Sequence, residues 1–194
     1  KNIAETEKFF DELNSKSIKS HHKLVVCPPF TSLHIAKIKT NKTDISIGAQ
    51  NCFYEDKGAF TGEVSASMLA NMNIEYVIVG HSERRDYFKE TNTVINKKIH
   101  AILKNKMKAI LCVGEKLDVR SQGKAIEFVI SQVEECLSNI TENDMKNIII
   151  AYEPIWSIGS GKAIEPSDAE DLCRNIRDFL SSKYSNSIVK NVPI

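Results

Sequence analysis

The sequence contains no apolar run near eighteen residues, the length that a helix needs to cross a bilayer. Its formal net charge is only +1 at pH 7, so charge gives no reason to expect binding to nucleic acid or to a membrane surface. Residues 1–7 are amphipathic and acidic, which is not the pattern of a signal peptide. We therefore predict no membrane partner and no nucleic-acid partner.

The cysteine pattern excludes two common uses. The five cysteines are odd in number and widely spaced, so they fit neither a disulfide framework nor a zinc-binding pattern. Cys27 and Cys112 lie inside apolar runs, where a thiol usually packs as a small hydrophobic group. Cys112 as a nucleophile is an alternative that its apolar neighbours disfavour. We expect a reducing, cytoplasmic compartment.

The residues that are present indicate a globular protein. The chain has 194 residues, 42% hydrophobic and 26% charged, which is enough to bury a sizeable core in one domain. No low-complexity segment and no shift of composition marks a boundary. We therefore predict a single domain over residues 1–194.

Short apolar runs alternate with amphipathic segments along the whole chain. Each run is typical of a buried strand, and each amphipathic segment is typical of a helix. Alternation of this kind predicts a parallel sheet covered by helices, with right-handed crossovers. The first helix has no strand before it, and residues 192–194 look like the beginning of a sixth strand. The predicted strands are 23–27, 45–51, 76–80, 108–115 and 148–152, and the predicted helices are 2–14, 31–39, 63–72, 93–103, 125–140 and 166–184.

Residues 148–162 carry the strongest local pattern. A buried strand ends in the carboxylate of Glu153, and Pro154 stops the strand because proline disfavours the helical region for the residue before it. The following loop holds the only tryptophan of the chain, Trp156, and two glycines that give it a flexible tip. Taken alone, Glu153 is better explained as a surface residue in an ordinary loop.

Other strand ends give Glu153 a partner. His81 and Glu83 follow the third strand, and Glu115 ends the fourth. A parallel sheet brings such positions together at its carboxyl edge. A carboxylate and an imidazole in one pocket can abstract a proton beside a carbonyl while the imidazole polarises the carbonyl oxygen. The glycine-tipped loop could offer backbone N–H groups to a phosphate and close over it.

Four motifs together resemble the triosephosphate isomerase family. They run in the family's order through essentially the whole chain. They are residues 48–51 with 58–63 (Gly-Ala-Gln-Asn and Gly-Ala-Phe-Thr-Gly-Glu), 80–85 (Gly-His-Ser-Glu-Arg-Arg), 112–115 (Cys-Val-Gly-Glu) and 151–162 (Ala-Tyr-Glu-Pro-Ile-Trp-Ser-Ile-Gly-Ser-Gly-Lys).

The resemblance implies a (β/α)₈ barrel that interconverts dihydroxyacetone phosphate and glyceraldehyde 3-phosphate in glycolysis and gluconeogenesis. It implies no cofactor and no metal. Glu153 matches the catalytic base, His81 matches the electrophile, and Glu83 matches a buried acidic group beneath the site. Gly159, with Ser160 beside it, matches the phosphate-binding tip of a closing loop at residues 154–163.

The resemblance also implies a homodimer. The loop from Asn51 to Glu63 matches the segment that inserts into the partner subunit. Thr61 at the tip of this loop would approach the partner's site.

The sequence departs from the family at both ends. The first strand with its Asn-x-Lys pair is absent before residue 2, and Lys1 lacks the family's flanking residues. The chain stops at Ile194, before the phosphate loop of the seventh unit, the eighth strand and the last helix. About a fifth of a typical barrel of ~250 residues is missing. We therefore expect an incomplete barrel whose 194 residues alone have impaired activity.

Alternatives remain at this stage. The chain could be a non-catalytic interaction module that keeps the dimer loop, or another phosphate-handling barrel enzyme such as a lyase or synthase. His21 and His22 could suggest a metal, although no third ligand is visible at useful spacing. Arg84 and Arg85 could bind phosphate, but salt bridges that hold their loop are the favoured interpretation.

Overall fold

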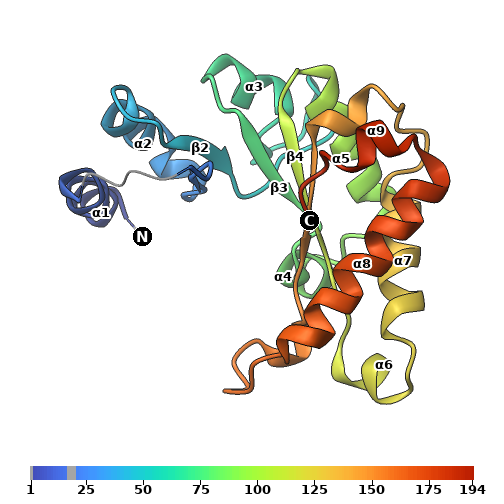
Figure 1. Ribbon diagram of the computed structural model, residues 1–194. Coiled ribbons are helices and arrows are strands. Elements are labelled where there is room, and N and C mark those ends of the chain that lie inside the picture. Colours follow the sequence, from blue (N-terminus) through green and yellow to red (C-terminus); the bar gives the residue numbers. More distant parts are fainter. Residues whose placement is uncertain (1, 17–20) are drawn as a thin grey trace. The chain divides into compact units, whose positions relative to one another are not determined.

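The computed structural model describes residues 2–16 and 21–194 (Figure 1). Strand hydrogen bonding gives the order β1-β2-β3-β4-β5. The elements are α1 (Ile3–Ser15), β1 (Val25–Val26), η1 (Phe30–Ser32), α2 (Leu33–Thr40), β2 (Ser46–Ala49), α3 (Ala66–Asn71), β3 (Tyr76–Val79), α4 (Ser82–Tyr87), α5 (Asn92–Lys104), β4 (Lys108–Val113), α6 (Leu117–Ser121), α7 (Ala125–Cys136), η2 (Asp144–Asn147), β5 (Ile148–Tyr152), η3 (Ile155–Ser157), α8 (Pro166–Lys183) and α9 (Asn186–Val189). The predicted α/β fold with its alternating strands and helices is confirmed.

Two predicted helix boundaries are wrong. Helix α3 begins at Ala66, because the hydroxyl of Ser65 accepts a hydrogen bond from the Met68 N–H at 3.1 Å and so caps the first turn. Helix α7 ends at Cys136, and Asn139 soon after it has φ of 59°. That left-handed conformation cannot continue a right-handed helix.

Contacts divide the chain into two compact units, which are described separately. One unit comprises Lys1–Ile78 and Ala101–Ala109, and the other comprises Val79–His100 and Ile110–Ile194. The single domain expected from the sequence stays a prediction.

The first unit is built on three parallel strands. Val25 pairs with Ser46 in the β1–β2 register, and Gly48 pairs with Tyr76 in the β2–β3 register. Helix α1 packs on α2, with Phe10 fully buried between the elements of this unit. Gly48 has no room for a side chain, because an added Cβ would lie 2.6 Å from the Cys27 sulfur.

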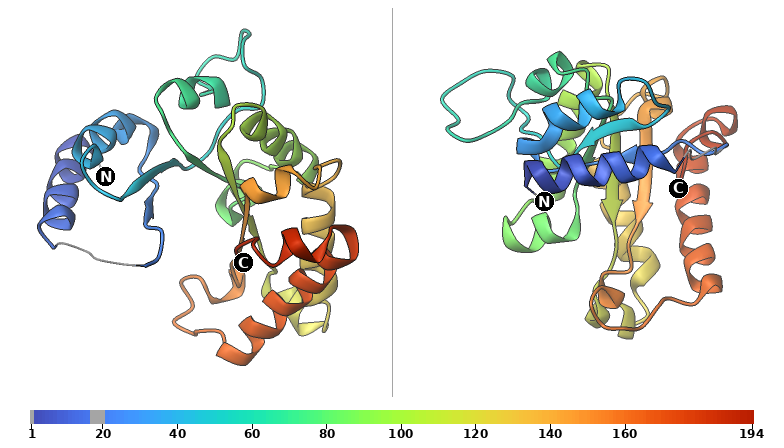
Figure 2. Two further views of the ribbon diagram at one scale, coloured as in Figure 1. Left: turned by 45° about the horizontal axis from the view of Figure 1, so that its top comes forward. Right: turned by 90° about the vertical axis from the view of Figure 1, so that its left-hand side faces the viewer.

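The second unit contains the carboxyl ends of β3 and β4 and all of β5. Helices α7 and α8 lie side by side in this unit (Figures 1 and 2). Its core is aliphatic and comes from the strands and from the inner faces of the helices. The fully or almost fully buried residues include Leu111, Val113, Val129, Val133, Ile148, Ile150 and Ile176. The burial of these side chains supplies the main driving force for folding of the unit.

The last residues of the chain lie alongside β5. The Ile150 N–H donates a hydrogen bond to the Pro193 carbonyl at 3.0 Å. The described residues contain no sixth strand, so this hydrogen bond is the one sign of the pairing that the sequence predicts for residues 192–194.

Candidate functional site

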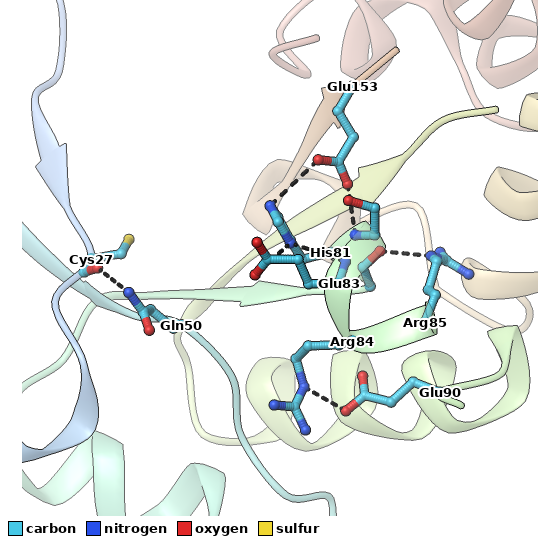
Figure 3. A network of polar contacts seen from close by, with 10 residues as sticks. Cys27, Gln50, His81, Glu83, Arg84, Arg85, Glu90 and Glu153 are labelled. Carbon is cyan, nitrogen blue, oxygen red and sulfur yellow. Dashed lines mark hydrogen bonds and ion pairs between the residues drawn. The ribbon is translucent and has the colours of Figure 1, made fainter. Parts of the chain in front are cut away.

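Glu153 and His81 meet within the second unit, although 71 residues separate them in sequence. Glu153 directly follows β5, and His81 directly precedes α4. The His81 Nε2 atom lies 3.4 Å from Glu153 Oε2 (Figure 3). The structure thus brings the predicted base and the predicted electrophile together at the carboxyl edge of the strands.

The orientation of the His81 ring follows from its place at the start of α4. The backbone N–H of Glu83 donates to His81 Nδ1 at 3.4 Å, so Nδ1 is the acceptor of the ring. In a neutral imidazole the proton then lies on Nε2, the atom that faces Glu153. The side chain is 35% exposed, so a ligand can reach it.

Glu153 is seated on the end of β4. Its backbone N–H donates to the Val113 carbonyl at 2.9 Å. Its own carbonyl approaches Gly114 so closely that a Cβ added there would lie 1.8 Å from that oxygen, which only glycine allows. The Ser82 N–H donates to Glu153 Oε1 at 2.9 Å, and the side chain is 19% exposed.

A second carboxylate, Glu115, is fully buried and anchors the start of the loop at residues 154–163. It accepts hydrogen bonds from the Tyr152 hydroxyl at 3.1 Å, the Trp156 indole N–H at 3.1 Å and the Arg120 guanidinium at 3.2 Å. Burial and the Glu115 charge raise the pKa of the Tyr152 phenol. Arg120 also pairs with Asp168 at the start of α8. Sequence reasoning placed Glu115 at a strand end but missed this network, for which the single tryptophan was the available signal.

The tip of the same loop is exposed. Gly159 and Gly161 have φ of 70° and 71°, and an added Cβ at either would meet nothing within 4 Å. The Ser160 hydroxyl donates to the Ser157 carbonyl at 2.9 Å, a contact within the loop itself. The loop is therefore held at the Trp156 end and open at the glycine end.

Glu83 corrects one expectation. The resemblance implies a buried acidic group, but the Glu83 side chain is 73% exposed. Its carboxylate lies 3.8 Å from His81 Nδ1 at the first turn of α4. Glu83 contacts the site through its backbone N–H, which donates to His81, while its side chain faces solvent.

The adjacent arginines bind protein groups. The Arg84 Nε donates to Glu90 Oε1 at 2.6 Å, and the buried Lys98 pairs with the same oxygen. The Arg85 guanidinium donates to two backbone carbonyls and to Asn92. These contacts favour the salt-bridge and loop-holding interpretation over phosphate binding.

The loop of residues 51–63 belongs to the first unit. It follows β2 and extends away from the neighbouring strands and helices of this unit (Figure 2). The Phe53 ring contacts Tyr54 and Phe60 at centroid distances of 4.4 Å and 4.7 Å. Asp56 pairs with Lys104 at 2.7 Å. Phe60 is 42% exposed and Thr61 is exposed, so the tip offers an aromatic and a hydroxyl group to a partner.

Two other kinds of site, a metal centre and a membrane span, are absent from the described residues. Within residues 2–16 and 21–194, no group of three or more histidine, cysteine or acidic side chains could hold a metal ion, so His21 and His22 lack a third ligand there. Of the helices in this described part, none is long and apolar enough to cross a membrane. Burial raises the pKa of the Cys27 and Cys136 thiols to about 11, which disfavours a reactive thiolate at either.

Parallel strands with a carboxylate and an imidazole at their carboxyl ends, next to a glycine-tipped loop, are typical of α/β-barrel enzymes. Comparison with known proteins gives the same class and narrows it. The family model for triosephosphate isomerase matches residues 1–194. The chain belongs to the triosephosphate isomerase family.

Individual relatives agree over the full length of the chain. The triosephosphate isomerase of Finegoldia magna is 45% identical over 195 residues, and that of Dictyoglomus turgidum is 43% identical over 195 residues. The triosephosphate isomerase of Alkaliphilus metalliredigens is 42% identical over 194 residues. In each case the alignment covers 100% of this chain and 78% of the relative. The family that the motifs predict is confirmed.

Proposed function

We propose that this chain supplies the proton-transfer groups of a triose-phosphate isomerase. The single observation that carries the proposal is the 3.4 Å approach of His81 Nε2 to Glu153 Oε2, with Nδ1 engaged by a backbone N–H. A carboxylate that faces an N–H donor is the pair that enolisation of a hydroxy ketone needs. The proposed substrates are dihydroxyacetone phosphate and glyceraldehyde 3-phosphate.

The proposed reaction moves one proton between neighbouring carbons. Glu153 takes the proton from the carbon beside the carbonyl, and the His81 Nε2–H stabilises the oxygen that becomes negative. His81 Nε2 passes its proton to this oxygen and takes one back from the neighbouring hydroxyl, and the carboxylic acid returns its proton to the former carbonyl carbon, so electrons and protons balance without a cofactor or metal. The Ser82 N–H on Glu153 Oε1 leaves Oε2 to act on the substrate.

The phosphate of the substrate is assigned to the glycine-tipped loop. The backbone N–H groups at Gly159 and Ser160 would bind the phosphate when the loop closes. The loop has the form that closure needs, because Trp156 fixes one end while the glycines leave the other end free to rearrange. Closure would also exclude water from the enediolate.

A homodimer forms part of the proposal. The aromatic cluster of Phe53, Tyr54 and Phe60 stiffens the loop of residues 51–63 and exposes Phe60. We assign this loop to the contact with a second copy, with Thr61 nearest the partner's site. Sedimentation equilibrium of the wild-type chain and of Phe60→Ser tests this assignment, because a monomeric wild type would overturn it.

The direct test of function is an isomerisation assay of the purified 194-residue chain with glyceraldehyde 3-phosphate, coupled to reduction of the ketone product. A matched assay uses the same chain extended by the family's Asn-x-Lys strand and its last phosphate loops. We expect slow turnover from residues 1–194 and a gain of at least about a hundredfold from the extended chain, since one electrostatic donor is worth about that much. A dimer without turnover in either form would instead support the interaction-module alternative. A cytoplasmic place in glycolysis or gluconeogenesis follows from the proposed reaction.

A further inference from the structure

Arg85 connects the end of β3, which leads into His81, to the end of β4, which Glu153 contacts through its backbone. It lies on α4, four residues after His81, and its side chain points back toward the strands (Figure 3). Its Nε donates to the Gly80 carbonyl at 2.6 Å, and its Nη2 donates to the Cys112 carbonyl at 3.2 Å. We propose that Arg85 is a positioning residue for His81 and Glu153. This inference rests on the proposed function.

The contact with Gly80 acts on His81. The Gly80 carbonyl belongs to the peptide group that joins Gly80 to His81. A hydrogen bond to this oxygen therefore fixes the orientation of the peptide plane that precedes the His81 side chain. Gly80 has φ of 73°, a conformation that glycine adopts without strain and that requires support to stay fixed. An added Cβ at Gly80 would lie 2.9 Å from Arg85 Nη2, so the guanidinium packs directly against this turn.

The contact with Cys112 acts on Glu153. Cys112 is followed by Val113, whose carbonyl accepts the Glu153 backbone N–H, and by Gly114, on which the Glu153 carbonyl packs. A shift of the β4 end would therefore shift Glu153 with it. The Arg85 guanidinium thus sets the distance between the Gly80 carbonyl, next to His81, and the end of β4, which Glu153 contacts.

Only arginine offers the required geometry. Its planar group has five donors in a fixed fork, and here Nη1 also donates to Asn92 Oδ1 at 2.5 Å. Asn92 in turn donates to Glu135 of α7 at 3.0 Å, which ties the clamp to a helix outside the site. A lysine carries the same charge, but its single nitrogen cannot hold two strand ends and Asn92 in one plane.

The adjacent Arg84 provides a matched control. It occupies the same helix and carries the same charge, but it donates to Glu90 and stacks 4.6 Å from the centroid of the Phe88 ring. A general loss of stability affects Arg84→Lys and Arg85→Lys alike. A loss of positioning affects Arg85→Lys alone.

The experiment uses the 194-residue chain labelled with ¹⁵N-histidine, in wild type, Arg85→Lys and Arg84→Lys, with His81→Gln to assign the imidazole signals. We expect wild type and Arg84→Lys to show the same His81 signals, with Nδ1 unprotonated. We expect Arg85→Lys to move these signals toward the average of the two tautomers. In the isomerisation assay, Arg85→Lys should lower kcat about tenfold or more with KM within about twofold, since small displacements of reacting groups are costly.

The outcomes separate the two proposals. Absence of turnover in every form contradicts the proposed function, while the imidazole signals still decide the role of Arg85. Unchanged His81 signals in Arg85→Lys, or equal changes in both lysine variants, overturn the inference. Should Arg85→Lys fail to fold, Asn92→Ser removes the third acceptor of the clamp and must move the His81 signals in the same direction for the inference to stand.

Discussion

The ends of β4 and β5 each carry a glutamate, and the two carboxylates have opposite surroundings. Glu115 after β4 is 0% exposed and accepts hydrogen bonds from three side chains. Glu153 after β5 is 19% exposed and contacts one backbone N–H and one imidazole nitrogen. The same residue type at neighbouring strand ends therefore serves two different purposes.

The difference shows how a carboxylate is kept either inert or reactive. A buried carboxylate with a full set of donors is held in place, because moving away would leave a buried charge without partners. A partly exposed carboxylate with few donors can exchange its partners for a substrate at small cost. Glu115 therefore anchors the loop through Trp156, while Glu153 remains available for proton transfer.

The largest expected effect is on turnover and comes from Glu153→Asp. Shortening the side chain by one methylene withdraws the carboxylate from its 3.4 Å contact with His81 Nε2. We expect kcat to fall roughly a hundredfold or more, within the range that general-base catalysis contributes, and the free energy of unfolding to change by less than about 1 kcal/mol. Steady-state kinetics of the extended chain measures the fall.

Glu127→Asp, an exposed glutamate in the first turn of α7, is the matched control and should keep full turnover. If Glu153→Asp had the same kcat as the wild type, Glu153 would not be the base. The distinction between a reactive Glu153 and a structural Glu115 would then fail.

Glu115→Gln should show the converse pattern, with a loss of stability. The amide cannot accept from Tyr152, Trp156 and Arg120 together, and it leaves Arg120 facing a neutral group. We expect the free energy of unfolding to drop by about 2 kcal/mol, the typical worth of a hydrogen bond to a charged group. Urea denaturation followed by Trp156 fluorescence measures the loss, and this residue is the only tryptophan of the chain.

Glu165→Gln is the control at the other end of the loop, because Glu165 makes no side-chain cap hydrogen bond to α8. Equal destabilisation by both substitutions would mean that Glu115 is not a special anchor.

Gly114→Ala tests how firmly the two strand ends are coupled. The new Cβ would lie 1.8 Å from the Glu153 carbonyl, so β5 must move away from β4. We expect a loss of about 1–3 kcal/mol in the free energy of unfolding, as for other overpacked sites, together with a lower kcat. Chemical denaturation and kinetics on one preparation measure both quantities.

Gly123→Ala separates strain from clash. Gly123 has φ of 72° and open space around it, so alanine there adds backbone strain alone and should leave kcat unchanged. A Gly114→Ala protein with wild-type kcat would show that the close packing of the Glu153 carbonyl on Gly114 does not position Glu153.

The meeting of His81 and Glu153 follows from the sequence, because parallel strands bring their carboxyl ends to one edge whatever their separation along the chain. The exposure of Glu83 could not be derived in this way, since it depends on what packs over α4. The contacts of Arg85 and Arg120 were equally hidden. Long side chains choose acceptors on other elements, and no local spacing reports which carbonyl or carboxylate lies within reach.

The smallest expected effect concerns pH and the hydroxyl that serves Glu115. Burial and the nearby Glu115 charge raise the Tyr152 pKa above its ordinary value of 10.0, so the folded protein keeps this proton where the unfolded chain releases it. The stabilising contribution is therefore complete below pH 10 and declines as the pH rises above 10. Tyr152→Phe removes this titration, and the free energy of unfolding should fall less steeply between pH 10 and pH 11 than in the wild type, as measured by urea denaturation at each pH.

Burial also raises the Tyr184 pKa, but Tyr184 donates to the Ile140 carbonyl, so Tyr184→Phe should flatten the same slope independently of Glu115. Only the Tyr152→Phe effect should shrink when it is combined with Glu115→Gln, and an additive double variant would show that the carboxylate after β4 does not hold Tyr152 as the contrast with Glu153 requires.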